Sequence, residues 1–387
     1  MNAGWVKPLV YKQLTKGLAR ALRTPQYLIL FLSDFCWMKC QHCWFNEEWK
    51  QKNLRSDTLQ FDELSRIAHS IDRILFLSLT GGEAFARHDV VDIVEMFGRT
   101  TKMSRYQIPT SGFQPDLIIR KAEEMLRKLP RTPFRVDVSL DGTEEVHEKV
   151  RRIKGGYGRL IQTVTGLNRL KRRYPHFDVG MITTISSYNQ HQVKDIADIA
   201  ARVNPGGEWM VNIVRGEVRD PLAGAVDPEN YIHAHQLIRS RIERGEYNGH
   251  SGHRSAPWLT AKNATRRKLI TRILQGRLAG GGCAAGALGG VIYSDGTVKP
   301  CEMLDQSLGN IRDFDYDLGA LWNSSAADAL RSWIQDTKCQ CTQECFLSVS
   351  LMIQPQHWPD IIRERLRLVG CANNLHSRAK ESLHGQV

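Results

Sequence analysis

The chain of 387 residues lacks any run of 18 apolar residues, so no stretch has the length and composition of a membrane-spanning helix. It also lacks the apolar core and small-residue cleavage site of a secretory signal peptide at its start. No internal repeat or low-complexity tract occurs. With 42% hydrophobic and 24% charged residues, the sequence predicts a cytoplasmic globular protein, large enough for one big domain plus a smaller one.

Acidic residues are in the minority, with 41 Asp and Glu against 53 Lys and Arg, a net charge of +12. This excess favours anionic partners: a phosphorylated or carboxylated substrate, an acidic lipid surface or nucleic acid. The nine cysteines do not follow a disulfide scaffold, because eight of them fall in two groups. Such groups indicate metal ligation. Cys371 stands apart and is interpreted as a lone buried thiol.

The first cysteine group is Cys36, Cys40 and Cys43, directly after an apolar run at 26–35. Three thiolates are one ligand short of a closed tetrahedral site. An iron-sulfur cubane with three protein ligands keeps one iron free for a small molecule, whereas structural zinc requires a fourth ligand. His42 is the nearby candidate for a fourth ligand, but in the sequence it stands between two of the cysteines, Cys40 and Cys43.

Short apolar runs alternate with segments of helical periodicity between about residues 26 and 215. Six strands separated in order by helices predict a parallel sheet with helices outside it. A partial (β/α)6 barrel and an open doubly wound sheet both satisfy this pattern. The expected strands are 26–35, 73–79, 104–109, 134–140, 177–185 and 208–214.

The spacing C-x3-C-x2-C at Cys36, Cys40 and Cys43 resembles the signature of the radical S-adenosylmethionine (SAM) superfamily. His42 stands at the position that is usually aromatic. The resemblance covers about residues 26 to 346 and implies an α/β fold, a partial (β/α)6 TIM-like barrel. It also implies a 4Fe-4S cluster whose open iron is chelated by SAM. One electron then cleaves SAM to methionine and a 5′-deoxyadenosyl radical.

The same resemblance implies a set of SAM-binding residues at the ends of strands. The Gly81, Gly82 and Glu83 element follows the second strand and matches the family element that contacts the amino group of SAM. Ser139 matches a position that hydrogen-bonds the ribose. Arg151, rather than the arginine after it, is expected to pair with the methionine carboxylate, and His42 is placed at the cluster.

The second cysteine group begins with Cys283 and Cys301, which flank an alternating segment around an Asp-Gly turn that predicts a hairpin. This region resembles the SPASM/twitch domain, which implies an auxiliary 4Fe-4S cluster in a small C-terminal α+β domain. The later C-x-C-x3-C run differs from the full SPASM pattern, so a single auxiliary cluster is expected. The later run is Cys339, Cys341 and Cys345. Two of these three cysteines are expected to join the first pair as ligands of the cluster, and a four-thiolate zinc site is the alternative.

Five regions are expected along the chain. An amphipathic N-terminal helix either closes the barrel or, through its basic face, makes peripheral contact with a membrane. Arg215, after the sixth strand, either contacts SAM or substrate or makes an ordinary ion pair. The regions are 1–25 (helix), 26–220 (radical SAM core), 221–280 (helical bridge), 281–346 (auxiliary-cluster domain) and 347–387 (C-terminal helix and tail).

The predicted function is that of a radical SAM enzyme, oxidoreductase-like, supplied with electrons by a donor such as flavodoxin or ferredoxin. Its substrate is expected to be a small molecule, anionic or lipid-like, that is oxidised, epimerised or joined by a new bond. A sugar or an aminocyclitol is another small-molecule substrate considered. Peptide modification is the alternative, less favoured because no winged-helix domain fits before Cys36. A zinc-bearing nucleic-acid-binding protein is the alternative of another class, but it leaves the strand-end motifs unexplained, so no nucleic acid is expected.

Overall fold

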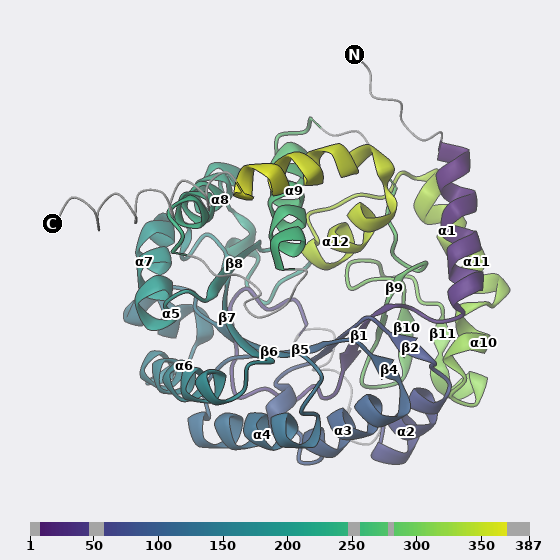
Figure 1. Cartoon of the computed structure of the whole chain (residues 1–387), viewed down its shortest axis with the longest axis horizontal. Coiled ribbons are helices and arrows are strands. Elements are labelled where there is room, and N and C mark those ends of the chain that lie inside the picture. The colour runs from purple at the N-terminus through teal and green to yellow at the C-terminus, as the bar shows by residue number, and fades with distance from the viewer. Residues whose placement is uncertain (1–7, 46–57, 247–255, 278–281, 370–387) are drawn as a thin grey trace, which may run out of the picture.

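The computed structural model describes residues 8–45, 58–246, 256–277 and 282–369. Its centre is a sheet of nine strands, six of which are parallel and neighbour one another in chain order without reversal (Figure 1). A doubly wound sheet would reverse this order, so the six strands form a partial barrel. The prediction of a partial (β/α)6 barrel is confirmed. The strands are β1 (Tyr27–Phe31), β3 (Phe76–Thr80), β5 (Tyr106–Thr110), β6 (Phe134–Ser139), β7 (Phe177–Ile185) and β8 (Glu208–Ile213).

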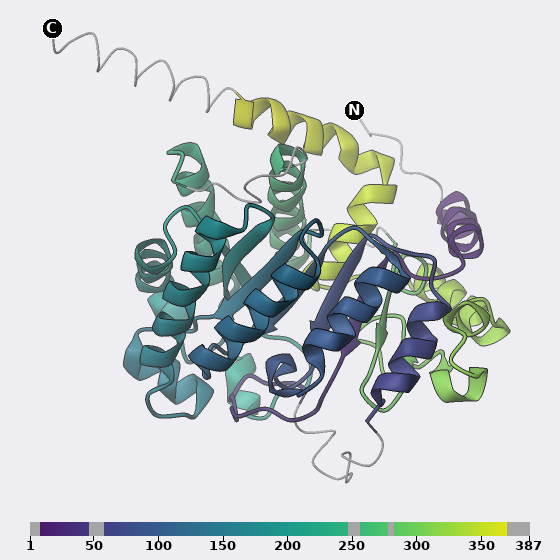
Figure 2. The same cartoon turned by 60° about the horizontal axis from the view of Figure 1, so that its bottom comes forward.

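Helices between the strands cover the outer face of this sheet, as Figure 2 shows for those of residues 61–128. In α4, Ile118, Ala122 and Met125 follow the helical period and are fully buried against the strands. Such burial on one face explains why these segments form helices. The outer helices are α2 (Phe61–His69), α3 (Val90–Thr100), α4 (Pro115–Lys128), α5 (Glu144–Arg151), α6 (Gly156–Arg173) and α7 (Val193–Val203).

The second expected strand, 73–79, is interrupted. Leu75 is exposed and separates β2 (Arg73–Ile74) from β3. β2 pairs instead with β4 (Lys102–Met103) in a separate two-stranded sheet. The core strand therefore begins at Phe76 and still ends at Thr80, directly before the glycine element.

The open side of the barrel, between β8 and β9 (Gly289–Ile292), is occupied by the bridging and C-terminal helices (Figure 1). Asn263 of α9 donates a hydrogen bond of 3.4 Å to Oε1 of Glu208, at the start of β8. Arg266 of the same helix donates to Ser348 of α12 at 2.7 Å. These contacts attach the later part of the chain to the core. The helices are α8 (Pro228–Glu243), α9 (Ala256–Leu274) and α12 (Glu344–Ile353), followed by a helical segment at 358–369.

The expected hairpin extends the core sheet rather than forming a sheet of its own. β9 (Gly289–Ile292) pairs in parallel with β1, with Gly289 opposite Tyr27. It turns at Gly296, whose φ of 84° suits glycine, into β10 (Thr297–Lys299), which pairs with β11 (Gly309–Asn310). The second cysteine region is therefore hydrogen-bonded directly to the first strand of the barrel.

The N-terminal helix α1 (Pro8–Leu22) packs against α11 (Ser325–Asp336). Lys12 pairs with Asp336 at 2.7 Å and Arg20 with Asp328 at 2.8 Å. Two of its basic side chains thus form ion pairs with the C-terminal region. Among the described helices, which include α10 (Leu318–Trp322), none is both long and apolar enough to cross a membrane.

Candidate active site

The two rim loops that follow β1 and β3 are held together by backbone contacts at the glycines. Gly81 has a φ of 128°, and a Cβ there would lie 2.2 Å from the carbonyl oxygen of Ser33. The Gly82 N–H donates to the same oxygen at 2.7 Å. Sequence analysis expected these glycines to allow close approach of a ligand. In the structure they also allow close approach of the loop that leads into the cysteines, and so position it.

The three thiols of this loop line one cavity of about 280 Å³ at the C-terminal ends of the strands. This is the edge where barrels of this type place their reactive groups. The cavity brings together most of the residues predicted from sequence to bind the cofactors. These are Cys36, Cys40, His42, Cys43, Gly81, Gly82, Ser139 and Arg151.

Glu83 lies behind the cavity and is only 2% exposed. Its Oε2 accepts hydrogen bonds from Thr110 Oγ1 at 3.0 Å and from the backbone N–H and hydroxyl of Ser111 at 2.9 and 2.7 Å. Burial raises the pKa of Glu83, and these hydrogen bonds oppose the rise. Its Oε1 has no partner among the described residues. A buried carboxylate oxygen without a donor suits the ammonium group expected there.

Arg151 projects into the cavity and is oriented by Asp141, with a closest approach of 2.5 Å. Its guanidinium also lies 3.5 Å from the sulfur of Cys40. Burial alone would raise the pKa of Asp141, but Arg151 holds it below its usual value. The neighbouring Arg152 has a left-handed backbone, with φ of 55°, and does not line the cavity. Arg151 therefore places a fixed positive charge beside a thiol and the cavity.

His42 is 8% exposed, and its Nδ1 has no partner within the described part of the chain. Burial lowers the pKa of His42 to about 4, so its ring is neutral near pH 7. With a neutral imidazole beside the three thiols, Arg151 is the cation next to Cys40.

Backbone N–H groups point at several of the sulfurs. Met38 N–H donates to Cys36 at 3.4 Å, Ala285 N–H to Cys283 at 3.5 Å, and Gln343 N–H to Cys341 at 3.4 Å. Hydrogen bonds of this kind stabilise the thiolate ligands of iron-sulfur clusters and tune their potentials. The donor set in both cysteine regions therefore fits clusters.

A single zinc ion would need all its ligands within about 2.3 Å of one point, whereas a cluster takes each thiolate on a different iron. Among the described residues no three His, Cys, Asp or Glu side chains could hold one metal ion.

Two family models match the chain: the radical SAM superfamily over residues 30–200 and the SPASM iron-sulfur cluster-binding domain over 283–346. The chain belongs to the radical SAM superfamily. Its C-terminal region is a SPASM-type domain. The cofactors of this radical SAM protein are accordingly a 4Fe-4S cluster, SAM, and further iron-sulfur in the SPASM domain.

Solved structures of similar fold include anSMEcpe with bound AdoMet and the Kp18Cys peptide, 16% identical, with a TM-score of 0.56 over 90% of this chain and 99% of that one. Streptococcus suis SuiB with S-adenosylmethionine is 15% identical, with a TM-score of 0.58 over 84% of this chain and 72% of that one. At these identities the similarity concerns the fold.

Curated relatives include a GTP 3′,8-cyclase of Alkaliphilus oremlandii, 23% identical over 46% of this chain. A second GTP 3′,8-cyclase, of Rippkaea orientalis, is 27% identical over 49% of this chain. The radical SAM protein spans about half the length of these relatives, 53% and 55%.

The five cysteines of the SPASM region do not lie in equivalent surroundings. Cys283, Cys301, Cys339 and Cys341 are linked by electrostatic interactions with one another. Cys345 instead has Glu302, Glu344 and Arg215 as its charged neighbours and lies beside Tyr27 at the start of β1. We infer that the first four thiols hold the auxiliary cluster.

Replacement of Cys345 by serine should therefore leave the auxiliary cluster in place, because in this assignment its thiol is not a cluster ligand. Replacement of Cys341 by serine should remove that cluster and lower iron from about eight to about four per chain. Iron and sulfide analysis after anaerobic purification measures both. Equal iron loss in the two variants, or loss in the Cys345 variant alone, would contradict this ligand set.

Four cavity residues escaped sequence analysis as functional residues. Thr184 and Asn212 line the cavity near the ends of β7 and β8, positions that the barrel rule alone could have identified. Ser111 lines it after β5, although no role was assigned to it. Glu302 was missed because only the preceding residue, Cys301, was interpreted as functional. The side chain of Glu302 lines the same cavity.

The SPASM region meets the barrel rim at Arg215. Its guanidinium pairs with Glu344 at 2.8 Å and donates to the carbonyl oxygen of Thr342 at 2.7 Å. Of the two interpretations of Arg215, the ion pair is the one observed, although the residue also lines the cavity. Glu302 lies close by, and burial raises its pKa to about 7, against the influence of Arg215. One cavity thus joins residues of both iron-sulfur regions.

Proposed function

We propose that this protein uses one electron, from a flavodoxin- or ferredoxin-type donor, to cleave SAM at a cluster held by Cys36, Cys40 and Cys43. A cluster held there would, with SAM, supply a 5′-deoxyadenosyl radical for hydrogen abstraction from a small-molecule substrate. That substrate is oxidised, epimerised or joined by a new bond with an auxiliary 4Fe-4S cluster nearby. The cavity shared by the thiol loop and Glu302 carries this proposal.

The residues of the barrel rim have separate tasks in this proposal. Gly81 and Gly82 hold the cysteine loop in place through Ser33. Oε1 of Glu83 accepts a hydrogen bond from the ammonium group of SAM. Ser139 contacts the ribose. Arg151, fixed by Asp141, offers its guanidinium to the methionine carboxylate. Enclosure of these groups excludes water from the reacting atoms.

The substrate end of the cavity is formed by Asn212, Arg215 and Glu302. Arg215 is already paired with Glu344. Glu302 accepts a hydrogen bond from Gln343 at Oε2 and offers its Oε1 to a substrate. A carboxylate accepts hydrogen bonds from hydroxyl or amine groups. We therefore favour a small molecule rich in such donors, such as a sugar or aminocyclitol.

Peptide modification is the second candidate function. It is supported by the similarity in fold to anSMEcpe with bound peptide and to SuiB bound to the precursor peptide SuiA. Under this alternative the hydroxyl or amine donor facing Glu302 belongs to a side chain of the peptide.

Deuterium transfer tests the proposed function. The anaerobically purified, reduced protein is mixed with SAM and with deuterated candidate substrates, sugars and aminocyclitols in one set and peptides in the other. Deuterium in 5′-deoxyadenosine from one set identifies the substrate class. Absence of 5′-deoxyadenosine from a protein with about eight irons per chain would contradict SAM cleavage itself.

Glu302→Gln should weaken use of the substrate while leaving SAM binding intact. Burial raises the pKa of Glu302 to about 7, so the comparison is made above pH 7, where the carboxylate form dominates. The change keeps the size of the side chain but removes this charge, and a hydrogen bond to a charged group contributes about 1.5–3 kcal/mol. We expect kcat/KM for the substrate to fall roughly 10- to 100-fold. The substrate-independent rate of 5′-deoxyadenosine formation is the internal control. Unchanged kcat/KM would remove Glu302 from substrate binding.

A further inference from the structure

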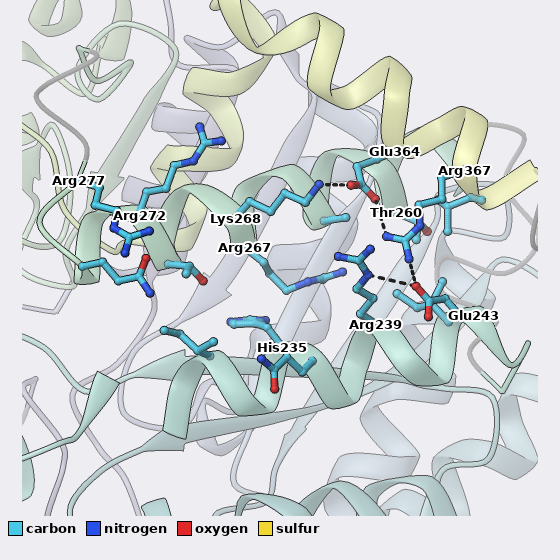
Figure 3. A pocket seen from close by; sticks show the side chains of 17 residues that line it. His235, Arg239, Glu243, Thr260, Arg267, Lys268, Arg272, Arg277, Glu364 and Arg367 are labelled. Carbon is cyan, nitrogen blue, oxygen red and sulfur yellow. Dashed lines mark hydrogen bonds and ion pairs between the residues drawn. The ribbon is translucent and has the colours of Figure 1, made fainter. Parts of the chain in front are cut away.

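A second cavity, of about 350 Å³, lies between α8, α9 and the helical segment 358–369. None of its lining residues lines the cavity of the three thiols. The function proposed above therefore assigns no role to it. Figure 3 shows it from close by, with the three helical elements around it.

Positive charge dominates this second cavity. Six basic side chains line it against two acidic ones. Both acids are already paired: Glu364 with Lys268, and Glu243 with Arg239 and Arg367 (Figure 3). The six basic residues are Arg239, Arg267, Lys268, Arg272, Arg277 and Arg367.

Arg272 and Arg277 are exposed and line the end of the cavity that Figure 3 shows away from Glu243. Neither side chain has a hydrogen bond or ion pair with a residue in the described ranges. Two guanidinium groups without a carboxylate partner leave a positive charge at this end of the cavity, which an anion would offset. Guanidinium groups in this arrangement favour phosphate, whose oxygens match their paired N–H donors.

His235 provides an independent sign of a ligand. It is 9% exposed and lines the cavity from α8, yet both ring nitrogens have no partner among the described residues. Burial and then the charge of Arg267 lower the pKa of His235, so the ring is neutral and keeps one N–H donor. A buried imidazole with no hydrogen bond is costly unless something accepts from it.

The remaining lining is apolar, with Ile232, Ile242 and Leu368 among it. Small-molecule sites are typically clefts of roughly 300–1,000 Å³ with apolar walls and a few polar groups. The volume and the mixed lining therefore suit a compact ligand with an apolar body and an anionic end.

We propose that this second cavity binds the phosphate group of a phosphate monoester with an apolar body, using Arg272, Arg277 and His235. The ester is either a soluble metabolite or the headgroup of a lipid. The lipid source has one feature in its favour, since Ile362 and Leu366 are 48% and 67% exposed on the same helical segment.

Calorimetric titration of the complete, anaerobically purified protein with hexyl phosphate tests the site. Arg272→Gln and His235→Phe should each raise Kd about tenfold or more, because each removes a donor to a charged group. Arg363→Gln is the matched control. That arginine lies on the same helical segment and pairs with Asp360, but it does not line the cavity.

Sedimentation with vesicles distinguishes the two sources. Binding to vesicles of phosphatidic acid and phosphatidylcholine, lost in Arg272→Gln but not in Arg363→Gln, identifies a lipid headgroup. Binding of hexyl phosphate alone identifies a soluble ester.

Three results would overturn the site: no binding of hexyl phosphate by the unchanged protein, no effect of either cavity variant, or equal weakening by Arg363→Gln. Thermal unfolding and iron content verify that each variant is folded, and SAM cleavage should be unaffected, so failure here is separable from failure of the proposed function.

Discussion

Cys40→Ala is expected to abolish reductive cleavage of SAM. Cys40 is 6% exposed, lines the cavity and lies 3.5 Å from the guanidinium of Arg151. It is one of only three thiols in its loop, so its loss leaves two ligands for a cluster that needs three to keep a defined open iron. Formation of 5′-deoxyadenosine should fall to the level without enzyme. Chromatography of the anaerobic reaction measures it.

Cys371→Ala is the control for this experiment, because Cys371 belongs to neither cysteine group in the sequence. It should retain full cleavage and about eight irons per chain. The Cys40 variant should keep the auxiliary cluster, and so about four irons. Cleavage at the original rate in the Cys40 variant would mean that SAM is not activated at this loop.

Cys301→Ala is expected to separate SAM cleavage from product formation. Cys301 is buried next to Glu302, and its sulfur interacts with Cys283 and with backbone groups at Met303 and Leu304. Its loss should remove the auxiliary cluster while the cluster at the first loop remains. Some 5′-deoxyadenosine should still form. No product should form, because the auxiliary cluster that accepts the electron from the substrate, or lies beside the substrate, is missing. The ratio of 5′-deoxyadenosine to product is the measurement.

The matched control for Cys301→Ala is Cys345→Ser, the fifth thiol of the region, which contacts Tyr27. It should keep cleavage and product formation coupled. Full, coupled activity of the Cys301 variant would remove the auxiliary cluster from the mechanism. A variant without any cleavage would show instead that the two cluster regions are structurally inseparable, as the pairing of β9 with β1 could cause.

Some features of the site were readable from local sequence. The spacing of Cys36, Cys40 and Cys43 is a short-range pattern, and the loop that carries it follows a strand whose apolar residues are unmistakable. The glycines at 81 and 82 were likewise predicted at a strand end. Their contact with Ser33 could not be predicted, because it depends on how two separate rim loops pack.

Other features depend on residues far apart in the chain. Arg151 lines the cavity, but Asp141, which orients it, was interpreted only as part of a turn. Spacing left open which thiols share the auxiliary cluster, and the contact of Cys345 with Tyr27 became visible only after folding. Local patterns carry no information on such partners.

By itself, the sequence determined the class of chemistry, through the thiol spacing and the glycine element, and the alternation of strands and helices. These signals act over a few residues. They left a barrel and a doubly wound sheet both open, and the family resemblance favoured the barrel. The tertiary structure alone decided that β9 joins the core sheet, that Glu302 reaches the cavity of the three thiols, and that a second, basic cavity forms around His235. The reason is physical: these arrangements arise from packing of segments up to hundreds of residues apart, where burial and charge pairing, rather than local propensity, select the partner.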